Sequence, residues 1–241
     1  MSSNAVEMEN ITLHFPKQTN ALKMIINIFR RKKQRFTALR GVSLNVKKGE
    51  VLGVIGKNGS GKSTLLRIIS GIYPADEGVC KVSGSISLLA GLGTGFSGHQ
   101  TGRENAILYG SILGHPEEVM NAKLPEIIEF SELGKFIDEP VRTYSSGMKA
   151  RLGLAVASAI HPEILLIDEV LGVGDPQFRE KSKKRILDLV KSTGTVVLVS
   201  HSFGLMREIC DRLAFIHKGK IVDVGEPEEI IKKYYEITGS E

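Results

Sequence analysis

The run of residues Gly56–Thr64, Gly-Lys-Asn-Gly-Ser-Gly-Lys-Ser-Thr, constrains the fold more than any other part of the chain. It follows an apolar run, Val51–Ile55, that predicts a buried strand of a parallel sheet. Glycines in such a loop let the backbone curl around an anion, so that successive N–H groups face phosphate oxygens. Strand, loop and following helix predict an α/β fold and a nucleoside triphosphate site. The alternative, a chance glycine-rich turn, is disfavoured because so many positions match.

Two side chains of this loop have roles of their own. Lys62 opens a helix whose positive dipole end faces the phosphates, and its ammonium group reaches the β- and γ-phosphates. Ser63 supplies a hydroxyl to Mg²⁺, which prefers oxygen ligands. The residues predicted to bind ATP in the loop are Gly56, Lys57, Asn58, Gly59, Ser60, Gly61, Lys62, Ser63 and Thr64.

Two adjacent carboxylates follow a second apolar run, Ile164–Ile167. Ligand sites in open α/β sheets lie at the carboxyl ends of the strands, where this run delivers Asp168 and Glu169. We expect Asp168 to hold the Mg²⁺ shell through water. We expect Glu169 to polarise the water that attacks the γ-phosphate. The alternative is that both carboxylates only cap the next helix electrostatically.

A third apolar run, Thr195–Ser200, ends next to His201. An imidazole at a strand end can donate a hydrogen bond to the γ-phosphate and so sense its presence. A lone histidine in this position is usually an ordinary loop residue. The functional interpretation of His201 depends on its agreement in order and spacing with the other motifs.

The order of these motifs, with Tyr144–Lys149 (Tyr-Ser-Ser-Gly-Met-Lys) before the carboxylates, closely resembles the nucleotide-binding subunit of ABC transporters over essentially the whole chain. The resemblance implies ATP and Mg²⁺ as cofactors and a head-to-tail homodimer. It also implies that the signature loop of one subunit, Ser145, Ser146 and Gly147, caps the ATP held by the other. A helix N-terminus with free N–H groups suits that task.

Two further roles follow from the same resemblance. Phe15 would stack on adenine, and the alternative, an ordinary core aromatic at the end of an amphipathic strand, is nearly as well supported. Asp175 would lie in a loop at the dimer interface. Because the chain holds one phosphate loop, the composite site must be completed by another chain, most simply an identical one.

Several segments depart from the general family pattern. Tyr144–Met148 replaces Leu-Ser-Gly-Gly-Gln, and Val170–Asp175 (Val-Leu-Gly-Val-Gly-Asp) replaces a form ending Ser-Ala-Leu-Asp. The glycine-rich segment Ala90–Phe96 stands where the family has its lid glutamine, a role that we assign to no residue. With Thr101–Asn105 (Thr-Gly-Arg-Glu-Asn), these variants resemble the subfamily of the Wzt type, which exports O-antigen, capsule and teichoic acid.

The subfamily resemblance implies that the chain is the ATP-hydrolysing motor of an exporter. Its partners would be an integral membrane permease and, as transported substrate, a polysaccharide linked to a lipid carrier. The alternatives are the ATPase subunit of a different transporter and an ABC-type ATPase with no part in transport. The latter usually shows a long coiled-coil insertion or two cassettes in one chain, and neither pattern occurs here.

The chain has a net charge of +5, and its densest basic run is Arg30–Lys33 with Arg35. No aromatic residues alternate with them for base stacking, so we expect no nucleic-acid partner. They end an insertion over roughly 16–36, whose apolar residues have helical spacing. The insertion either lies against the membrane surface or the permease, or packs on its own domain with a solvated basic end.

The chain also lacks membrane and secretion signals. No apolar stretch approaches the roughly 20 residues of a membrane-spanning helix, and no signal peptide is apparent near Met1. We therefore expect a peripheral protein at the cytoplasmic face of the inner membrane. The two cysteines are too few for a disulfide framework or a metal site.

We expect one ABC nucleotide-binding domain over residues 1–241. Its RecA-like core, a mostly parallel sheet with an antiparallel β subdomain, would cover roughly 1–95 and 161–241, and an inserted helical lobe roughly 96–160. In that lobe, helices are expected to begin at Thr101, Pro116 and Ser146, the last reaching Ile160. The chain stops soon after its final helix, so it is either a short form without a glycan-binding domain or a truncated form.

Overall fold

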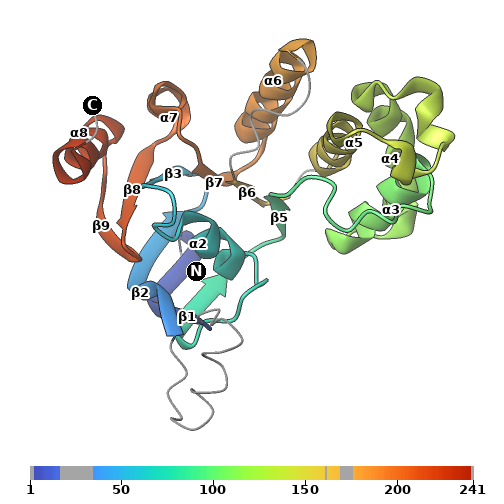
Figure 1. The fold of residues 1–241 in the computed structure, drawn as a ribbon. Coiled ribbons are helices and arrows are strands. Elements are labelled where there is room, and N and C mark those ends of the chain that lie inside the picture. The colour runs from blue at the N-terminus through green and yellow to red at the C-terminus, as the bar shows by residue number, and fades with distance from the viewer. Residues whose placement is uncertain (1–2, 17–34, 161, 169–175, 240–241) are drawn as a thin grey trace, which may run out of the picture. The chain divides into compact units, whose positions relative to one another are not determined.

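The computed structural model describes residues 3–16, 35–160, 162–168 and 176–239. The chain forms two compact units, Met1–Ser83 with Val199–Glu241, and Gly84–Leu198 (Figure 1). Strands and helices occur in both units, and the predicted α/β fold is confirmed. The predicted boundaries of core and helical lobe remain a prediction.

An antiparallel sheet of the first unit contains β1 (Asn4–Pro16), β2 (Arg35–Lys47) and β4 (Glu77–Val82), in the order β2-β1-β4. Along the second half of β2, buried and exposed residues alternate, as in a sheet with one buried face. β1 and β2 pair along their whole length, from Asn4 with Lys47 to Pro16 with Arg35, with bulges that interrupt the register.

The first unit also contains the strand that precedes the phosphate loop. β3 (Val51–Ile55) is parallel to β8 (Arg212–His217), and β8 forms a hairpin with β9 (Lys220–Gly225). The helices of the first unit are α2 (Lys62–Ile69), α7 (Phe203–Ile209) and α8 (Pro227–Thr238). The four apolar residues Leu65, Leu66, Ile68 and Ile69 give α2 a buried face.

The second unit has its own strands. β5 (Ile86–Leu89) is parallel to β6 (Ile164–Asp168), and β7 (Thr195–Val199) is the other neighbour of β6. Every residue of β7 is buried, as are the first four of β6. Such continuous burial explains why both strands read as uninterrupted apolar runs in the sequence.

The second unit also holds the helices α3 (Gly102–Ile112), α4 (Glu117–Ser131), α5 (Ser146–Ser158) and α6 (Pro176–Ser192), with short 3₁₀ turns at Gly134–Asp138 and Val141–Thr143. The predicted helix starts are confirmed. At α3, Thr101 and Glu104 form a capping box, the signal by which such a start is read. α5 ends at Ser158, short of the predicted Ile160, because Pro162 disfavours continued helix.

Cations over aromatic rings join α6 to α4 and α5. The guanidinium of Arg151 lies 4.6 Å from the ring centre of Phe178, and the ammonium of Lys181 lies 4.9 Å from that of Phe130. Both cations also pair with Glu132 at the end of α4. These contacts fix the signature helix α5 against its neighbours within the second unit.

Candidate functional site

The phosphate loop lies between the buried strand β3 and helix α2, as the sequence predicted. The side chain of Lys62 is buried, with only 6% of its surface exposed. Its Nζ donates hydrogen bonds to the carbonyl oxygens of Gly56, at 2.8 Å, and of Lys57, at 3.3 Å. The ammonium group therefore lies within the curve of the loop, where phosphate oxygens could replace these carbonyls.

Glycines of the loop serve packing as well as curvature. Gly61 has φ +114°, and a Cβ atom there would lie 2.8 Å from the side chain of Leu39 and 3.1 Å from the carbonyl oxygen of Ala38. At Gly56 a Cβ would lie 2.3 Å from the carbonyl oxygen of Ile216. β2 and β8 thus approach the loop so closely that no side chain fits, a reason for these glycines that the sequence prediction did not include.

One hydroxyl of the loop is buried without a hydrogen-bond partner among the described residues. Ser60 is 5% exposed, and its Oγ receives and donates no such bond there. An unpaired buried hydroxyl costs about 1–3 kcal/mol. A bound polar ligand would remove that cost. Ser63 and Thr64, at the start of α2, are half-buried, while Lys57, Asn58 and Gly59 are exposed.

Two other predicted residues belong to the same unit. The half-buried ring of Phe15 meets that of Tyr73 edge to face, with ring centres 5.5 Å apart. His201 is exposed and immediately precedes Ser202, whose Oγ caps helix α7 by accepting from the Leu205 N–H. The adenine-stacking role of Phe15 and the γ-phosphate role of His201 stay predictions.

The second unit contains the signature loop and one carboxylate. Ser145 caps α5, and its Oγ accepts a hydrogen bond from the Met148 N–H at 3.2 Å. Ser145 and Ser146 are exposed, and a Cβ on Gly147 would meet no atom nearer than 3.7 Å. The start of this helix is therefore open to solvent within its unit. Asp168 is half-buried at the last position of β6.

Tyr144, the residue before the signature loop, is buried and held by a hydrogen bond from its hydroxyl. The hydroxyl of Tyr144 donates to the carbonyl oxygen of Phe136, and burial raises the pKa of this phenol to about 12. It therefore stays protonated as a donor at neutral pH.

Among the remaining predicted positions, Glu169, Asp175 and residues 17–34 of the insertion lie outside the described residues.

Asn105 is a structural residue of this region to which the sequence prediction gave no role. It is fully buried, and its side-chain amide nitrogen lies within 2.9–3.1 Å of three backbone carbonyl oxygens, those of Ser97, Gln100 and Thr101. Its Oδ1 accepts from the Ser97 N–H at 2.7 Å. Asn105 thereby holds the end of the glycine-rich segment against α3. The only signal was its place in the Thr-Gly-Arg-Glu-Asn run.

The same segment also lies directly on the signature helix. A Cβ atom on Gly153 of α5 would be 2.5 Å from the backbone nitrogen of Gly93 and 3.0 Å from the carbonyl carbon of Leu92. Further along, the Val141 N–H donates to the Gln100 carbonyl at 2.9 Å, shortly before the signature loop. The chain after β5 is thus bound to both ends of the signature region.

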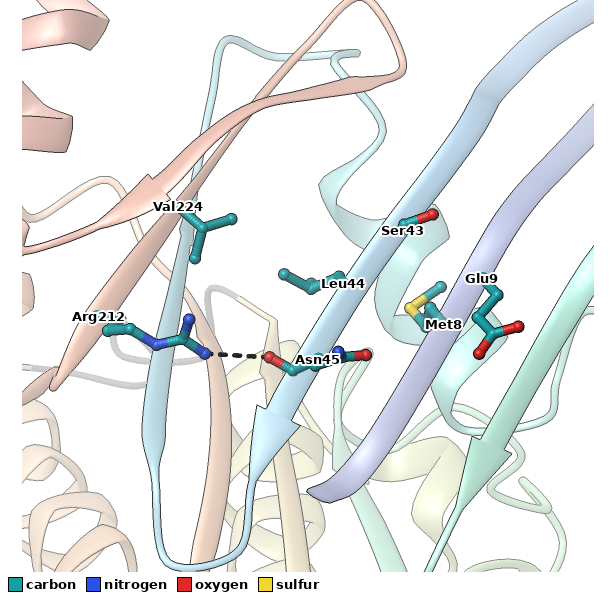
Figure 2. A pocket seen from close by; sticks show the side chains of 7 residues that line it. All are labelled: Met8, Glu9, Ser43, Leu44, Asn45, Arg212 and Val224. Carbon is teal, nitrogen blue, oxygen red and sulfur yellow. Dashed lines mark hydrogen bonds between the residues drawn. The ribbon is translucent and has the colours of Figure 1, made fainter. Parts of the chain in front are cut away.

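A hollow of about 310 Å³ lies at the start of β8, the end of the strand that is far from the phosphate loop. Its lining combines Met8, Leu44 and Val224 with polar residues, and the Arg212 guanidinium donates to the Asn45 carbonyl at 3.1 Å (Figure 2). Arg212 also forms a two-point ion pair with the buried Glu50. None of the predicted site residues lines this hollow.

The fold is that of ATP-binding cassettes. A dimeric, post-hydrolysis ATP-binding cassette bound to ADP and Pi has a TM-score of 0.71 at 22% identity, covering 92% of this chain and 98% of that one. An ATP-binding subunit of an ABC transporter has a TM-score of 0.73 at 20% identity, covering 95% and 93%.

Several curated relatives have a higher sequence identity to this chain than these solved structures have. The O-antigen export system ATP-binding protein RfbB of Myxococcus xanthus is 50% identical over 83% of this chain and 46% of its own length. The teichoic acids export ATP-binding protein TagH of Enterococcus faecalis is 46% identical over 88% of this chain and 47% of its own length. RfbB of Klebsiella pneumoniae is 43% identical over 84% of this chain and 82% of its own length. The chain thus spans about half the length of the first two relatives.

Residues 39–172 match the ABC transporter family. The chain belongs to this family, and the resemblance inferred from its motifs is confirmed. The names of the relatives agree with the predicted subfamily. No helix among the described residues combines the length and the apolar character needed to cross a bilayer.

Proposed function

We propose that this chain is the ATP-binding and ATP-hydrolysing subunit of an exporter that moves a lipid-linked polysaccharide, of O-antigen, capsule or teichoic-acid type, across the cytoplasmic membrane. The observation that carries the ATP part is the buried Lys62 ammonium group inside the curve of the phosphate loop. The relatives at 40–50% identity, which bear export names, support the cargo.

Binding would use the loop backbone and four side chains. Lys62 would exchange its bonds to loop carbonyls for bonds to the β- and γ-phosphates, and the Ser60 hydroxyl would gain a polar partner. The ring of Phe15, already held edge-on by Tyr73, would offer a face to adenine. His201 would donate to the γ-phosphate from the end of β7.

Oxygen donors at the predicted positions fit Mg²⁺. Ser63 offers a half-buried hydroxyl next to Lys62, and Asp168 offers a half-buried carboxylate at a strand end. Mg²⁺ takes oxygen ligands and usually completes its shell with phosphate and water oxygens, so one hydroxyl and one carboxylate suit it. When bound, Mg²⁺ supplies charge neutralisation to the phosphates.

Hydrolysis would need Glu169 and a second copy of the chain. Glu169 would accept a proton from the attacking water and orient it in line with the γ-phosphate. The open start of α5, with Ser145 and Gly147, would cap the γ-phosphate held by the partner subunit. Asp175 would lie at the same interface. Closure of the dimer would then move a membrane permease at the cytoplasmic face.

A phosphate-release assay tests the catalytic part. The wild-type protein should hydrolyse ATP, and Glu169→Gln should bind ATP but leave it intact. Glu169→Gln keeps the size of the side chain while removing the base, so binding serves as the internal control. Turnover at the wild-type rate in this variant would refute the role of Glu169. Absence of ATP binding by the wild-type protein would refute the proposed function.

Deletion of the chain from its host tests the cargo. Finished lipid-linked glycan should accumulate inside the cell and disappear from the surface, and re-expression of the wild-type chain should reverse both changes. Re-expression of Lys62→Ala serves as the control that ties export to nucleotide binding. Normal surface glycan in the deletion strain, with no second exporter present, would exclude polysaccharide as the cargo while leaving the ATPase assignment intact.

A further inference from the structure

The turn between β8 and β9 is hydrogen-bonded to the phosphate loop. The Gly219 N–H donates to the carbonyl oxygen of Ser60 at 2.9 Å. The carbonyl oxygen of Gly219 accepts from the N–H of Arg40, in β2, at 2.8 Å. A single residue of the hairpin therefore connects the loop to the antiparallel sheet through its own backbone.

Only glycine fits this position. Gly219 has φ +79°, and a Cβ atom there would lie 2.5 Å from the carbonyl oxygen of Ala38 and 3.1 Å from the carbonyl carbon. The obstacle is backbone rather than a flexible side chain, so any larger residue must move the turn or the strand. Moving the turn would break or redirect the bond to Ser60.

The C-terminal part of the chain approaches the loop at two more points. The Ile216 carbonyl oxygen lies against Gly56, 2.3 Å from where a Cβ atom would stand. The Lys57 ammonium group donates to the Thr238 carbonyl oxygen, in the last turn of α8, at 2.8 Å. The start of the loop therefore meets the same hairpin and the helix that follows it.

The bond to Ser60 sets the direction of the next N–H group. A peptide unit is planar and trans, so its C=O and N–H point in opposite directions. Because the Ser60 carbonyl points to Gly219, the Gly61 N–H of the same peptide unit must point away from the hairpin. Phosphate loops bind anions through N–H groups aimed in fixed directions, so a fixed peptide plane is a requirement for affinity.

We propose that Gly219 is a positioning residue of the nucleotide site, which holds the Ser60–Gly61 peptide plane so that its N–H faces the phosphates. The proposal rests on the proposed function of the loop as an ATP site. Gly219 itself touches no nucleotide; it acts through the Ser60 carbonyl. The hairpin that follows His201 is then part of the ATP-binding machinery rather than an appendage of the sheet.

Two alanine substitutions at matched glycines separate this role from general backbone strain. Gly71, just after α2, has φ +75°, close to that of Gly219, but a Cβ atom there would meet nothing within 4 Å. Gly219→Ala and Gly71→Ala carry similar conformational strain, and only the former disturbs the loop. With Mg²⁺ and a fluorescent ADP derivative, we expect Gly219→Ala to bind roughly tenfold more weakly, the scale of one lost hydrogen bond to a charged group. Gly71→Ala should bind as the wild type does.

Amide hydrogen exchange of the wild-type protein gives a readout that does not depend on either variant folding. ADP should slow exchange at the Gly219 amide, which donates to the loop, and should leave the Gly71 amide, which donates to the Ile68 carbonyl, unchanged. Unchanged affinity of folded Gly219→Ala, or ADP binding without protection at Gly219, would overturn the proposal. Failure of the wild-type protein to bind ADP would instead overturn the proposed function.

Discussion

Asn105→Asp exchanges one NH₂ group for an oxygen and should destabilise the second unit strongly. The new oxygen would lie 2.9–3.1 Å from the three carbonyl oxygens that the amide nitrogen contacts. Two N–H donors are lost, each contributing about 1 kcal/mol, and the buried carboxylate keeps only the Ser97 N–H, which already donates to Oδ1 of Asn105. We expect a loss of about 3 kcal/mol in the free energy of unfolding at pH 8.

The pH dependence of the stability loss in Asn105→Asp gives a second test of this reasoning. Burial among carbonyls should raise the pKa of the new carboxyl above its ordinary value of about 3.9 in the folded state. Its protonated form is then favoured by folding, so the deficit is smallest below about pH 4 and grows as the pH rises toward the folded pKa. Wild-type Asn105 does not titrate, so the difference from wild type isolates this carboxyl.

Urea denaturation at pH 5 and pH 8 measures both effects. Asn121→Asp, the same exchange on the exposed face of α4, is the matched control and should change stability by less than about 0.5 kcal/mol. If Asn105→Asp were as stable as Asn121→Asp at pH 8, the hydrogen bonds of Asn105 would not hold the glycine-rich segment.

Three other outcomes are expected. Gly153→Ala should cost about 1–3 kcal/mol in a denaturant melt, since its Cβ would meet backbone at 2.5 Å. Gly204→Ala, a helical glycine with open space around it, should gain stability, and equal effects would contradict the close packing. Burial raises the pKa of Cys210 to about 12, so mass spectrometry should find it unalkylated at pH 8 until the protein unfolds; rapid native labelling would argue against its burial. Ser145→Arg should spare ATP binding yet abolish hydrolysis, and lost binding would contradict a shared site.

Much of the fold follows from local signals in the sequence. The start of α3 was readable because Thr101 and Glu104 satisfy each other's backbone donors within one turn. β3, β6 and β7 were readable as apolar runs, because nearly all of their residues are buried. The lengths of β1 and β2 could not be read from the sequence, because the pairing of Asn4 with Lys47 depends on a partner distant in sequence.

The candidate site could likewise be predicted only in part from the sequence. The loop from Gly56 to Lys62 is recognisable because consecutive residues carry its chemistry. The contacts that hold it come from Ala38, Ile216 and Gly219, which no spacing rule connects to the loop. The structural role of Asn105 could not be predicted either, because the hydrogen-bond partners of a buried asparagine depend on how the backbone around it folds.

The bond from Lys57 to the last turn of α8 makes that helix end a convenient place for a reporter. A small fluorophore at position 239 would sit within a few residues of a carbonyl that the phosphate loop contacts. If nucleotide drew the Lys57 ammonium away, the dye's surroundings would change without any label on the loop itself. Titrations of binding could then be followed in the intact chain, and the same attachment point would show whether a protein joined after α8 alters nucleotide affinity.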